Sequence, residues 1–206
     1  MINKLDQIII QIEGGQQVSR YARSIANRNK VEIGMHTYGS CFDREFNNGG
    51  QVKVGRYCSF ASNVRYFGAN HPINYASMSP YFYNKMWGYK VEDIKREKLV
   101  IGNDVWIGYG VIITSSCKEI GTGSVIAAGA IVTENVPEYA IVMGAPARIK
   151  RFRFSEETQK LLNKSRWWEL EPDVLMKYYN LIDEPDVWAK TIIKEINNCN
   201  VKHVKI

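Results

Sequence analysis

The sequence predicts a mainly β protein, a parallel β-helix of hexapeptide repeats with one protruding loop, a short N-terminal helix and a C-terminal helical tail. The prediction depends on a six-residue rhythm between residues 99 and 143. Read in sixes from Ile101, the chain gives IGNDVW, IGYGVI and ITSSCK; after one extra residue, Glu119, it gives IGTGSV, IAAGAI and VTENVP. This period fits neither an amphipathic helix nor an alternating strand. It is typical of a prism in which three hexads close one coil of roughly 18 residues.

Two positions of each hexad carry the side chains that we expect inside the prism. The first position is always β-branched: Ile101, Ile107, Ile113, Ile120, Ile126 and Val132. The fifth position is always small or apolar: Val105, Val111, Cys117, Ser124, Ala130 and Val136. The second position is Gly, Gly, Thr, Gly, Ala and Thr. We expect glycine or another small residue at a tight corner, and glycine has no Cβ to clash.

Weaker hexads precede this regular region. IGMHTY begins at Ile33, and the rhythm then breaks over residues 39–51. It resumes with Val54, Phe60 and Tyr66, which are spaced by six. We therefore expect prism coils over residues 31–69 and 99–143.

Helical segments are expected at both ends of one domain, residues 1–206. Apolar residues at helical spacing predict a helix over residues 1–13, within a lead-in that extends to residue 30. Residues 144–206 hold a turn and then helices, the first of which begins near Ser155 because Glu156 and Glu157 follow it. Helical patterns continue to residue 196, and residues 197–206 are expected to fray.

Residues 70–98 interrupt the prism with about 29 residues that lack the hexad rhythm. The stretch NHPINYASMSPYFYNKMWGYK supplies one imidazole, several aromatic rings and few charges. Long excursions from a regular scaffold are usually binding or active-site loops, and aromatic faces stack on sugar rings. We assign Tyr75, Tyr81 and Trp87 to acceptor binding. The alternative is a loop that only covers the prism wall.

Composition narrows the classes of function. The formal charge of +6 and the basic run Arg148, Lys150, Arg151 and Arg153 suit an acidic ligand. That run has one interleaved aromatic residue, Phe152, and lacks the aromatic platform on which single-stranded nucleic acids stack, so we expect no nucleic-acid partner. Four cysteines show no CxxC or zinc spacing, and three dispersed histidines do not form a metal site, so we expect no metal. Without a membrane span or a signal-peptide pattern, a cytoplasmic protein is expected.

Five stretches in order carry a family resemblance: VGRYCSFASNV, NHPINYAS, VIGNDVWIG, IAAGAIVTENVPEYAIVMGAPARIKRFRF and WWEL. With them, residues 21–170 resemble the hexapeptide acyltransferases, and within these the xenobiotic acetyltransferase branch that includes chloramphenicol and streptogramin acetyltransferases. The resemblance implies a left-handed coil and a homotrimer with active sites between subunits. It also implies acetyl-CoA as acetyl donor and a loop histidine as general base.

The resemblance assigns roles to single residues. His71 matches the general base, whereas His36 lies within a hexad and His203 lies in the tail. A neutral imidazole suits the role, because acetyl transfer to a hydroxyl requires removal of the hydroxyl proton. The residues implied on the cofactor side are Trp106, Gly110, Ala128, Thr133, Arg148, Lys150 and Arg151. Trp106 as packing under a loop, and the basic residues as a solvated face, are the alternatives.

One difference from many relatives lies beside Thr133, where Glu134 replaces a lysine. This difference puts a phosphate contact at that position in doubt.

The predicted function is acetyl-CoA-dependent O-acetylation of a carbohydrate hydroxyl, by direct transfer with His71 as base. The run HPINYASMSPYFYN lacks the Phe-Pro-Phe-like end of drug-modifying relatives and is closer to relatives that modify glycans. Acetylation of chloramphenicol or a streptogramin, N-acetylation of an amino sugar, and a trimeric binding scaffold without catalysis are the alternatives.

Overall fold

The computed structural model describes residues 4–203, with side chains through residue 197. Chain contacts divide it into two compact units, Met1–Arg151 and Phe152–Ile206. The first unit contains the prism, the protruding loop and the N-terminal helices. The second contains the C-terminal helices.

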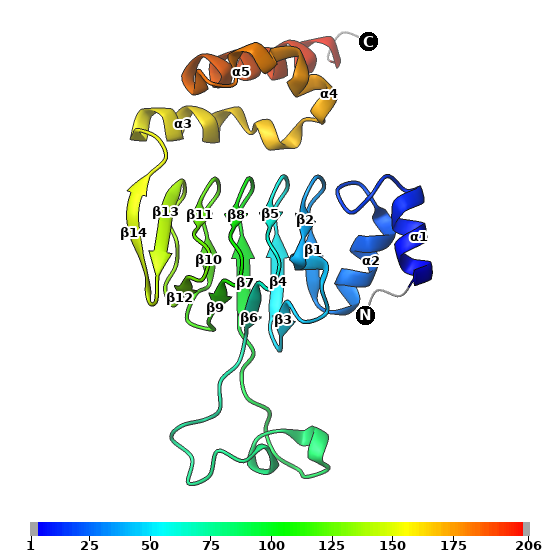
Figure 1. Ribbon diagram of the computed structural model, residues 1–206, viewed down its shortest axis with the longest axis vertical. Helices are drawn as coiled ribbons and strands as arrows, with labels where there is room; N and C mark the ends of the chain where they lie inside the picture. The colour runs from blue at the N-terminus through cyan, green and yellow to red at the C-terminus, as the bar shows by residue number, and fades with distance from the viewer. Residues whose placement is uncertain (1–3, 204–206) are drawn as a thin grey trace. The chain divides into compact units, whose positions relative to one another are not determined.

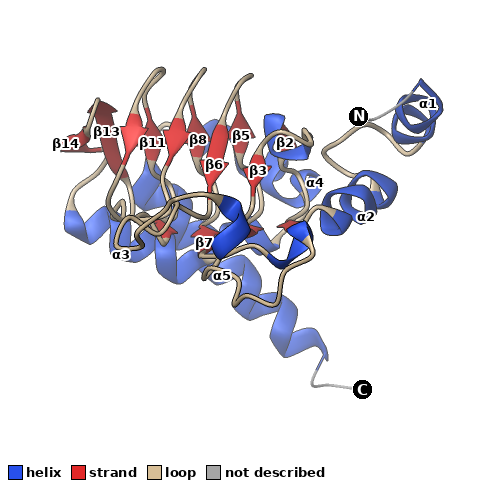
Figure 2. Cartoon of the chain, turned by 90° about the horizontal axis from the view of Figure 1, so that it is seen from below, coloured by secondary structure: helices blue, strands red, loops and turns tan. Residues whose placement is uncertain are grey.

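Three parallel sheets form the walls of the prism, and the chain visits them in turn (Figure 1). The first sheet holds β1 (Val31–Ile33), β4 (Gln51–Val54), β7 (Lys98–Ile101) and β10 (Glu119–Ile120). The second holds β2 (Tyr38–Gly39), β5 (Ser59–Phe60), β8 (Trp106–Ile107), β11 (Val125–Ile126), β13 (Ala140–Gly144) and β14 (Ala147–Phe152). The third holds β3 (Asn47–Asn48), β6 (Arg65–Phe67), β9 (Ile112–Ile113) and β12 (Ile131–Val132). Figure 2 shows β5, β8, β11 and β13 in one row. The fold is the predicted left-handed parallel β-helix.

The interior of the prism follows the hexad pattern. Every first-position and fifth-position residue is buried, which confirms the predicted core. Equivalent residues stack from coil to coil, since Ile107 lies in register with Phe60 on one side and Ile126 on the other. Burial of each large aliphatic side chain contributes roughly 1.5–3 kcal/mol relative to exposure.

Glycine at the second hexad position avoids a clash with the next coil, as predicted. A Cβ built on Gly102, at the second hexad position, would lie 2.5 Å from the backbone nitrogen of Thr122, so glycine there admits the next coil. Positive φ angles occur at the fourth position instead, for example at Asp104 and Gly110. The predicted reason for these glycines, the absence of a Cβ, is therefore confirmed, whereas the left-handed backbone of the corner lies two residues later.

Residues 39–51 lose the hexad rhythm without leaving the prism. The segment forms β2, a 3₁₀ turn over Ser40–Phe42 and β3, which pair with the strands of the next coil. Phe42 and Phe46 are buried, and the ring of Phe46 packs edge-on against Phe60. Two large aromatic side chains therefore fill the space that branched side chains fill in regular coils, and the predicted break is only a break in sequence.

Two helices precede the first coil. The predicted N-terminal helix is α1, Lys4–Ile12, and α2, Arg20–Arg28, was not predicted. Ser19 caps α2 by accepting a hydrogen bond from the backbone nitrogen of Ala22. Ala22 and Ala26 are buried in the same core as β1. The serine cap was the available signal for this helix.

The second unit consists of helices α3 (Glu156–Ser165), α4 (Pro172–Leu175) and α5 (Pro185–His203) with 3₁₀ turns between them. Ser155 caps α3, as predicted. Trp188 of α5 is buried and packs edge-on against Trp167. The expectation that the chain frays from residue 197 is wrong up to His203, and residues 204–206 lie outside the described part. Across the described helices, none combines the length and apolar character that crossing a bilayer demands.

Candidate active site

The protruding loop leaves the prism at the edge between the third and first sheets, after β6, and returns at β7 (Figure 1). It contains two short 3₁₀ turns, Pro80–Phe82 and Lys85–Trp87, and no strand. Hydrogen bonds hold its base: the backbone nitrogen of Glu97 donates to the carbonyl of Gly68 at 2.7 Å, and the amide of Asn70 donates to the Ser115 hydroxyl at 2.8 Å. These hydrogen bonds anchor the loop next to His71, the predicted general base.

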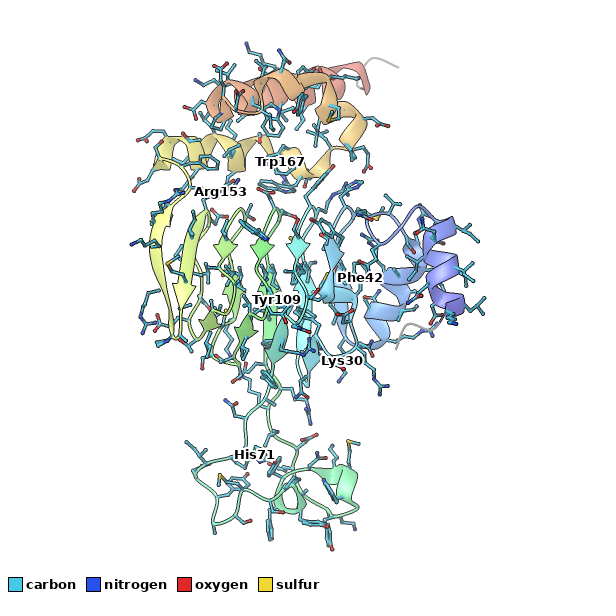
Figure 3. All side chains as sticks on the ribbon, in the orientation of Figure 1. Lys30, Phe42, His71, Tyr109, Arg153 and Trp167 are labelled. Atoms are coloured by element: carbon cyan, nitrogen blue, oxygen red, sulfur yellow. The ribbon has the colours of Figure 1, made fainter. Side chains whose placement is uncertain are left out.

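His71 is an exposed ring with one nitrogen engaged (Figure 3). Its Nδ1 lies 2.9 Å from the Met78 carbonyl oxygen and 2.7 Å from the Tyr83 hydroxyl oxygen. A carbonyl oxygen only accepts hydrogen bonds, so this contact favours the tautomer with the proton on Nδ1. Nε2 then carries the lone pair that a general base requires. Sequence reasoning did not find Met78 or Tyr83, because neither belongs to a recognisable motif.

Two of the three residues that were predicted to bind the acetyl acceptor, Tyr81 and Trp87, lie together on the loop. The ring of Tyr81 lies 4.8 Å from that of Trp87 and 5.8 Å from that of Tyr89, measured between centroids. All three rings are about half exposed. We call Tyr81, Trp87 and Tyr89 the ring cluster. Tyr75 is exposed in a separate turn, where its backbone nitrogen donates to the Pro72 carbonyl.

Several of the residues implied on the cofactor side lie at one corner of the prism, between the second and third sheets. Gly110 and Gly129 have positive φ and stack through a hydrogen bond from the Gly129 nitrogen to the Tyr109 carbonyl. A Cβ on either glycine would meet no atom within 4 Å, and Ala128 beside them is exposed. We call Gly110, Ala128 and Gly129 the glycine corner. Its backbone is open to close approach, which fits the narrow pantetheine arm of a CoA.

Trp106 and Thr133 lie on separate walls. Trp106 is on β8 of the second sheet, points outward as predicted and is 57% exposed. Thr133 follows β12 of the third sheet. Their predicted contacts with cofactor stay predictions.

The predicted basic residues do not form one patch. Arg148 and Lys150 alternate with Arg151 along β14, so strand geometry places the first two on one face and Arg151 on the other. The Arg148 guanidinium also lies 3.4 Å from the carboxylate of Glu134. The glutamate at the unusual position therefore offsets part of the positive charge beside Thr133. Arg148 and Lys150 still offer cationic groups that suit phosphates.

Within a single chain, the predicted general base His71 and the glycine corner lie apart. The loop leaves the prism at the edge between the third and first sheets, whereas the glycine corner lies at the edge between the second and third. Figure 3 shows the same separation, with His71 on the loop and Tyr109 on the prism. The third sheet lies between the two halves of the predicted site.

A separate cavity of about 1050 Å³ lies between α1 and the first coils. Its lining includes the polar residues Gln7, Gln11, Gln16, Tyr38 and Asp43 beside the apolar Ile10. Burial raises the pKa of the Asp43 carboxyl. Residues that the sequence predicted for the site do not line this cavity.

His36, Cys58 and Cys117 have structural positions, whereas the side chains of Cys199 and His203 lie outside the described ones. His36 is half-buried at a corner, and its ring lies 4.6 Å from that of Tyr57. Cys58 and Cys117 are buried free thiols, as predicted, and burial raises their pKa values to about 12 and about 11. Among the described side chains, residues 4–197, no cluster of three or more His, Cys, Asp or Glu is arranged to hold a metal ion.

Comparison with known proteins decides the family. No protein-family model matches the chain. A chloramphenicol acetyltransferase from Morganella morganii is 36% identical over 143 residues, which cover 66% of this chain and 68% of that protein. A probable macrolide acetyltransferase from Lysinibacillus sphaericus is 35% identical over 127 residues, which cover 58% of this chain and 70% of that protein. The chain belongs to the hexapeptide-repeat acetyltransferases, in the xenobiotic acetyltransferase branch.

A solved structure also matches in part. The hexapeptide-repeat acetyltransferase from Vibrio cholerae has 28% sequence identity and a TM-score of 0.45, over 61% of this chain and 64% of that one. As a member of this family, the protein is an acetyltransferase that uses acetyl-CoA as its donor.

Proposed function

We propose that this acetyltransferase transfers the acetyl group to a hydroxyl of a carbohydrate, with His71 as general base. The observation that carries the proposal is the arrangement of the loop. One loop presents an imidazole with Nε2 free of the recorded hydrogen bonds and the ring cluster of Tyr81, Trp87 and Tyr89. Half-exposed rings that already contact one another form a firm surface for the apolar face of a sugar.

The chain's own groups account for the proton transfers. Nε2 of His71 takes the proton of the acceptor hydroxyl while its oxygen forms the new bond to the acetyl carbon. The bond between that carbon and the thiol sulfur breaks, and His71 returns the proton to the departing thiolate. Acetyl-CoA supplies the activated acetyl thioester. Transfer is therefore direct, without an acetylated side chain.

The glycine corner, Trp106 and the cations of β14 are the proposed cofactor site. Open backbone at Gly110 and Ala128 admits the pantetheine arm, and Trp106 walls the thioester end. We assign Thr133 to the adenine, and Arg148 and Lys150, which share one face of β14, to the phosphates. The assignment of Arg151 stays a prediction, because it lies on the other face of the strand. Because Glu134 offsets Arg148, Arg148→Ala is expected to weaken acetyl-CoA binding less than Lys150→Ala, which calorimetry can measure.

We propose a homotrimer with active sites between subunits. The proposal is supported by the separation of the loop and the glycine corner on two edges of one prism. Three prisms that pack around an axis bring the loop edge of one copy toward the corner edge of the next. Light scattering that gives the mass of a single chain would contradict both the trimer and the shared site.

Chloramphenicol or a related antibiotic is the second candidate acceptor, because two relatives at 35–36% identity bear the names of antibiotic acetyltransferases. An amino sugar is the third, because the same base serves an amine. The hydroxyl of each acceptor would meet the same Nε2, so the acceptor must be identified by turnover.

The test is a thiol-release assay with acetyl-CoA and a panel of sugars, nucleotide sugars, amino sugars, chloramphenicol and a streptogramin. Turnover with a neutral sugar, reduced about 100- to 10,000-fold in His71→Ala, is the expected result. His36→Ala removes the histidine at the corner and is expected to retain activity. Turnover with antibiotics alone would overturn the carbohydrate proposal, and an active His71→Ala would overturn the base.

A further inference from the structure

Tyr83 differs from its neighbours on the protruding loop. Its side chain is 5% exposed, whereas Tyr81 and Phe82 are about half exposed. Its hydroxyl oxygen lies 2.7 Å from Nδ1 of His71. The two rings also pack edge-on, with centroids 5.6 Å apart and an interplanar angle of 83°. A buried tyrosine therefore contacts the proposed base through both its ring and its hydroxyl.

Nδ1 of His71 faces two oxygens, the Met78 carbonyl and the Tyr83 hydroxyl. The carbonyl accepts only, so it holds the proton on Nδ1. The hydroxyl oxygen carries lone pairs and is a second acceptor for the same N–H. Both partners are neutral, and His71 takes part in no ion pair recorded for the described side chains.

We infer that Tyr83 is a positioning residue for acetyl transfer, which holds the His71 ring and helps to stabilise the imidazolium that forms when Nε2 takes the acceptor proton. The inference rests on the proposed function of His71 as general base. In serine hydrolases an aspartate orients the histidine and stabilises its charged form. Here two neutral oxygens on one side of the ring have that role.

Tyr83→Phe removes the hydroxyl and keeps the ring that packs against His71. Loss of one acceptor destabilises the imidazolium more than the neutral ring, since hydrogen bonds to charged groups are the stronger ones. In the free Tyr83→Phe enzyme, the His71 imidazole is then expected to stay neutral to lower pH. The His71 titration midpoint is expected to fall by about one pH unit, and kcat is expected to fall about tenfold.

The test needs no acceptor. Ring ¹H–¹⁵N spectra, with His71 assigned by comparison with His71→Ala, follow the titration of the imidazole in the whole enzyme. Tyr66→Phe is the matched control, because Tyr66 is also a buried tyrosine but its hydroxyl has no hydrogen-bond partner among the described residues. Its His71 titration is expected to equal that of the wild type.

The outcomes separate the two proposals. A Tyr83→Phe titration equal to the wild type, or one shifted to higher pH, overturns the inference. A His71→Ala enzyme with full thiol release overturns the general base itself. If His71→Ala is inactive and Tyr83→Phe titrates as the wild type does, only the role of Tyr83 fails. Tyr83→Leu, which also loses the ring contact, shows how much of any rate loss is packing.

Discussion

The prism and the protruding loop of this acetyltransferase divide stability and chemistry between them. In the prism, each hexad buries the same two positions, and each buried residue packs against its equivalents in neighbouring coils. Among residues 70–98, the loop buries only Tyr83, and it depends on local hydrogen bonds. Repetition makes the prism stable at many positions. Because the loop has no repeating buried positions, its irregular chain can hold a single histidine in one place.

The largest expected effect contrasts one isoleucine in each region. Ile107→Ala removes a fully buried side chain from the prism and is expected to lower the unfolding free energy by about 2–5 kcal/mol. Ile73→Ala, on the loop, removes an 87% exposed side chain and is expected to change it by less than about 0.5 kcal/mol. Urea unfolding measures both. Equal costs would show that the loop carries as much of the stability as the prism.

The buried thiols make the unfolding free energy of the prism depend on pH. Burial raises the pKa of Cys58 from 9.0 to about 12, so this thiol stays protonated in the folded prism at a pH where it ionises in the unfolded chain. The unfolded state then binds fewer protons, and the unfolding free energy falls as pH rises from about 9 to about 12. Cys58→Ala is expected to flatten this fall in denaturant titrations across that range. An unchanged slope would show that other groups cause it.

The smallest effect concerns a polar atom inside the prism. The Tyr66 hydroxyl is buried without a hydrogen-bond partner among the described residues, and burial raises its pKa to about 12. An unsatisfied buried hydroxyl destabilises the folded state, so Tyr66→Phe is expected to raise the unfolding free energy by about 1 kcal/mol. A loss of stability in the thermal unfolding of this variant would show that the hydroxyl has a partner, such as an ordered water.

Sequence predicted most of the prism because the pattern repeats. Ile107 and Cys117 belong to series that reach the interior at every coil, so their burial follows from position alone. The pattern failed where a different solution fills the same space, as Phe42 and Phe46 do in the first coil. It also missed α2, whose buried alanines lack the bulky apolar spacing of a typical amphipathic helix.

The candidate site was predictable only in part. His71, Tyr81 and Trp87 could be selected by residue type on a loop, and the rings of the last two do meet. The contact of Tyr83 with His71 depends on how 13 residues of irregular chain fold back on themselves, from His71 to Tyr83, and no periodicity encodes that. The pairing of Arg148 with Glu134 likewise joins two strands' ends that are distant in sequence.

The central claim is that the loop of one copy and the glycine corner of another form each active site. Gly110→Trp blocks the glycine corner and leaves the loop intact, whereas His71→Ala disables the loop and leaves the corner intact. A Cβ at Gly110 meets no atom, so the added ring has room and would cover the corner. Gly110→Ala carries the same positive-φ strain without the bulk and is expected to stay active.

The decisive measurement is thiol release by mixed oligomers of His71→Ala and Gly110→Trp chains, purified through a different tag on each. Each variant alone is expected to be inactive. A mixed trimer contains one interface with both an intact loop and an intact corner, so about one third of wild-type activity is expected to return. Mixed oligomers that remain inactive would contradict the account, and would place the whole site within one chain.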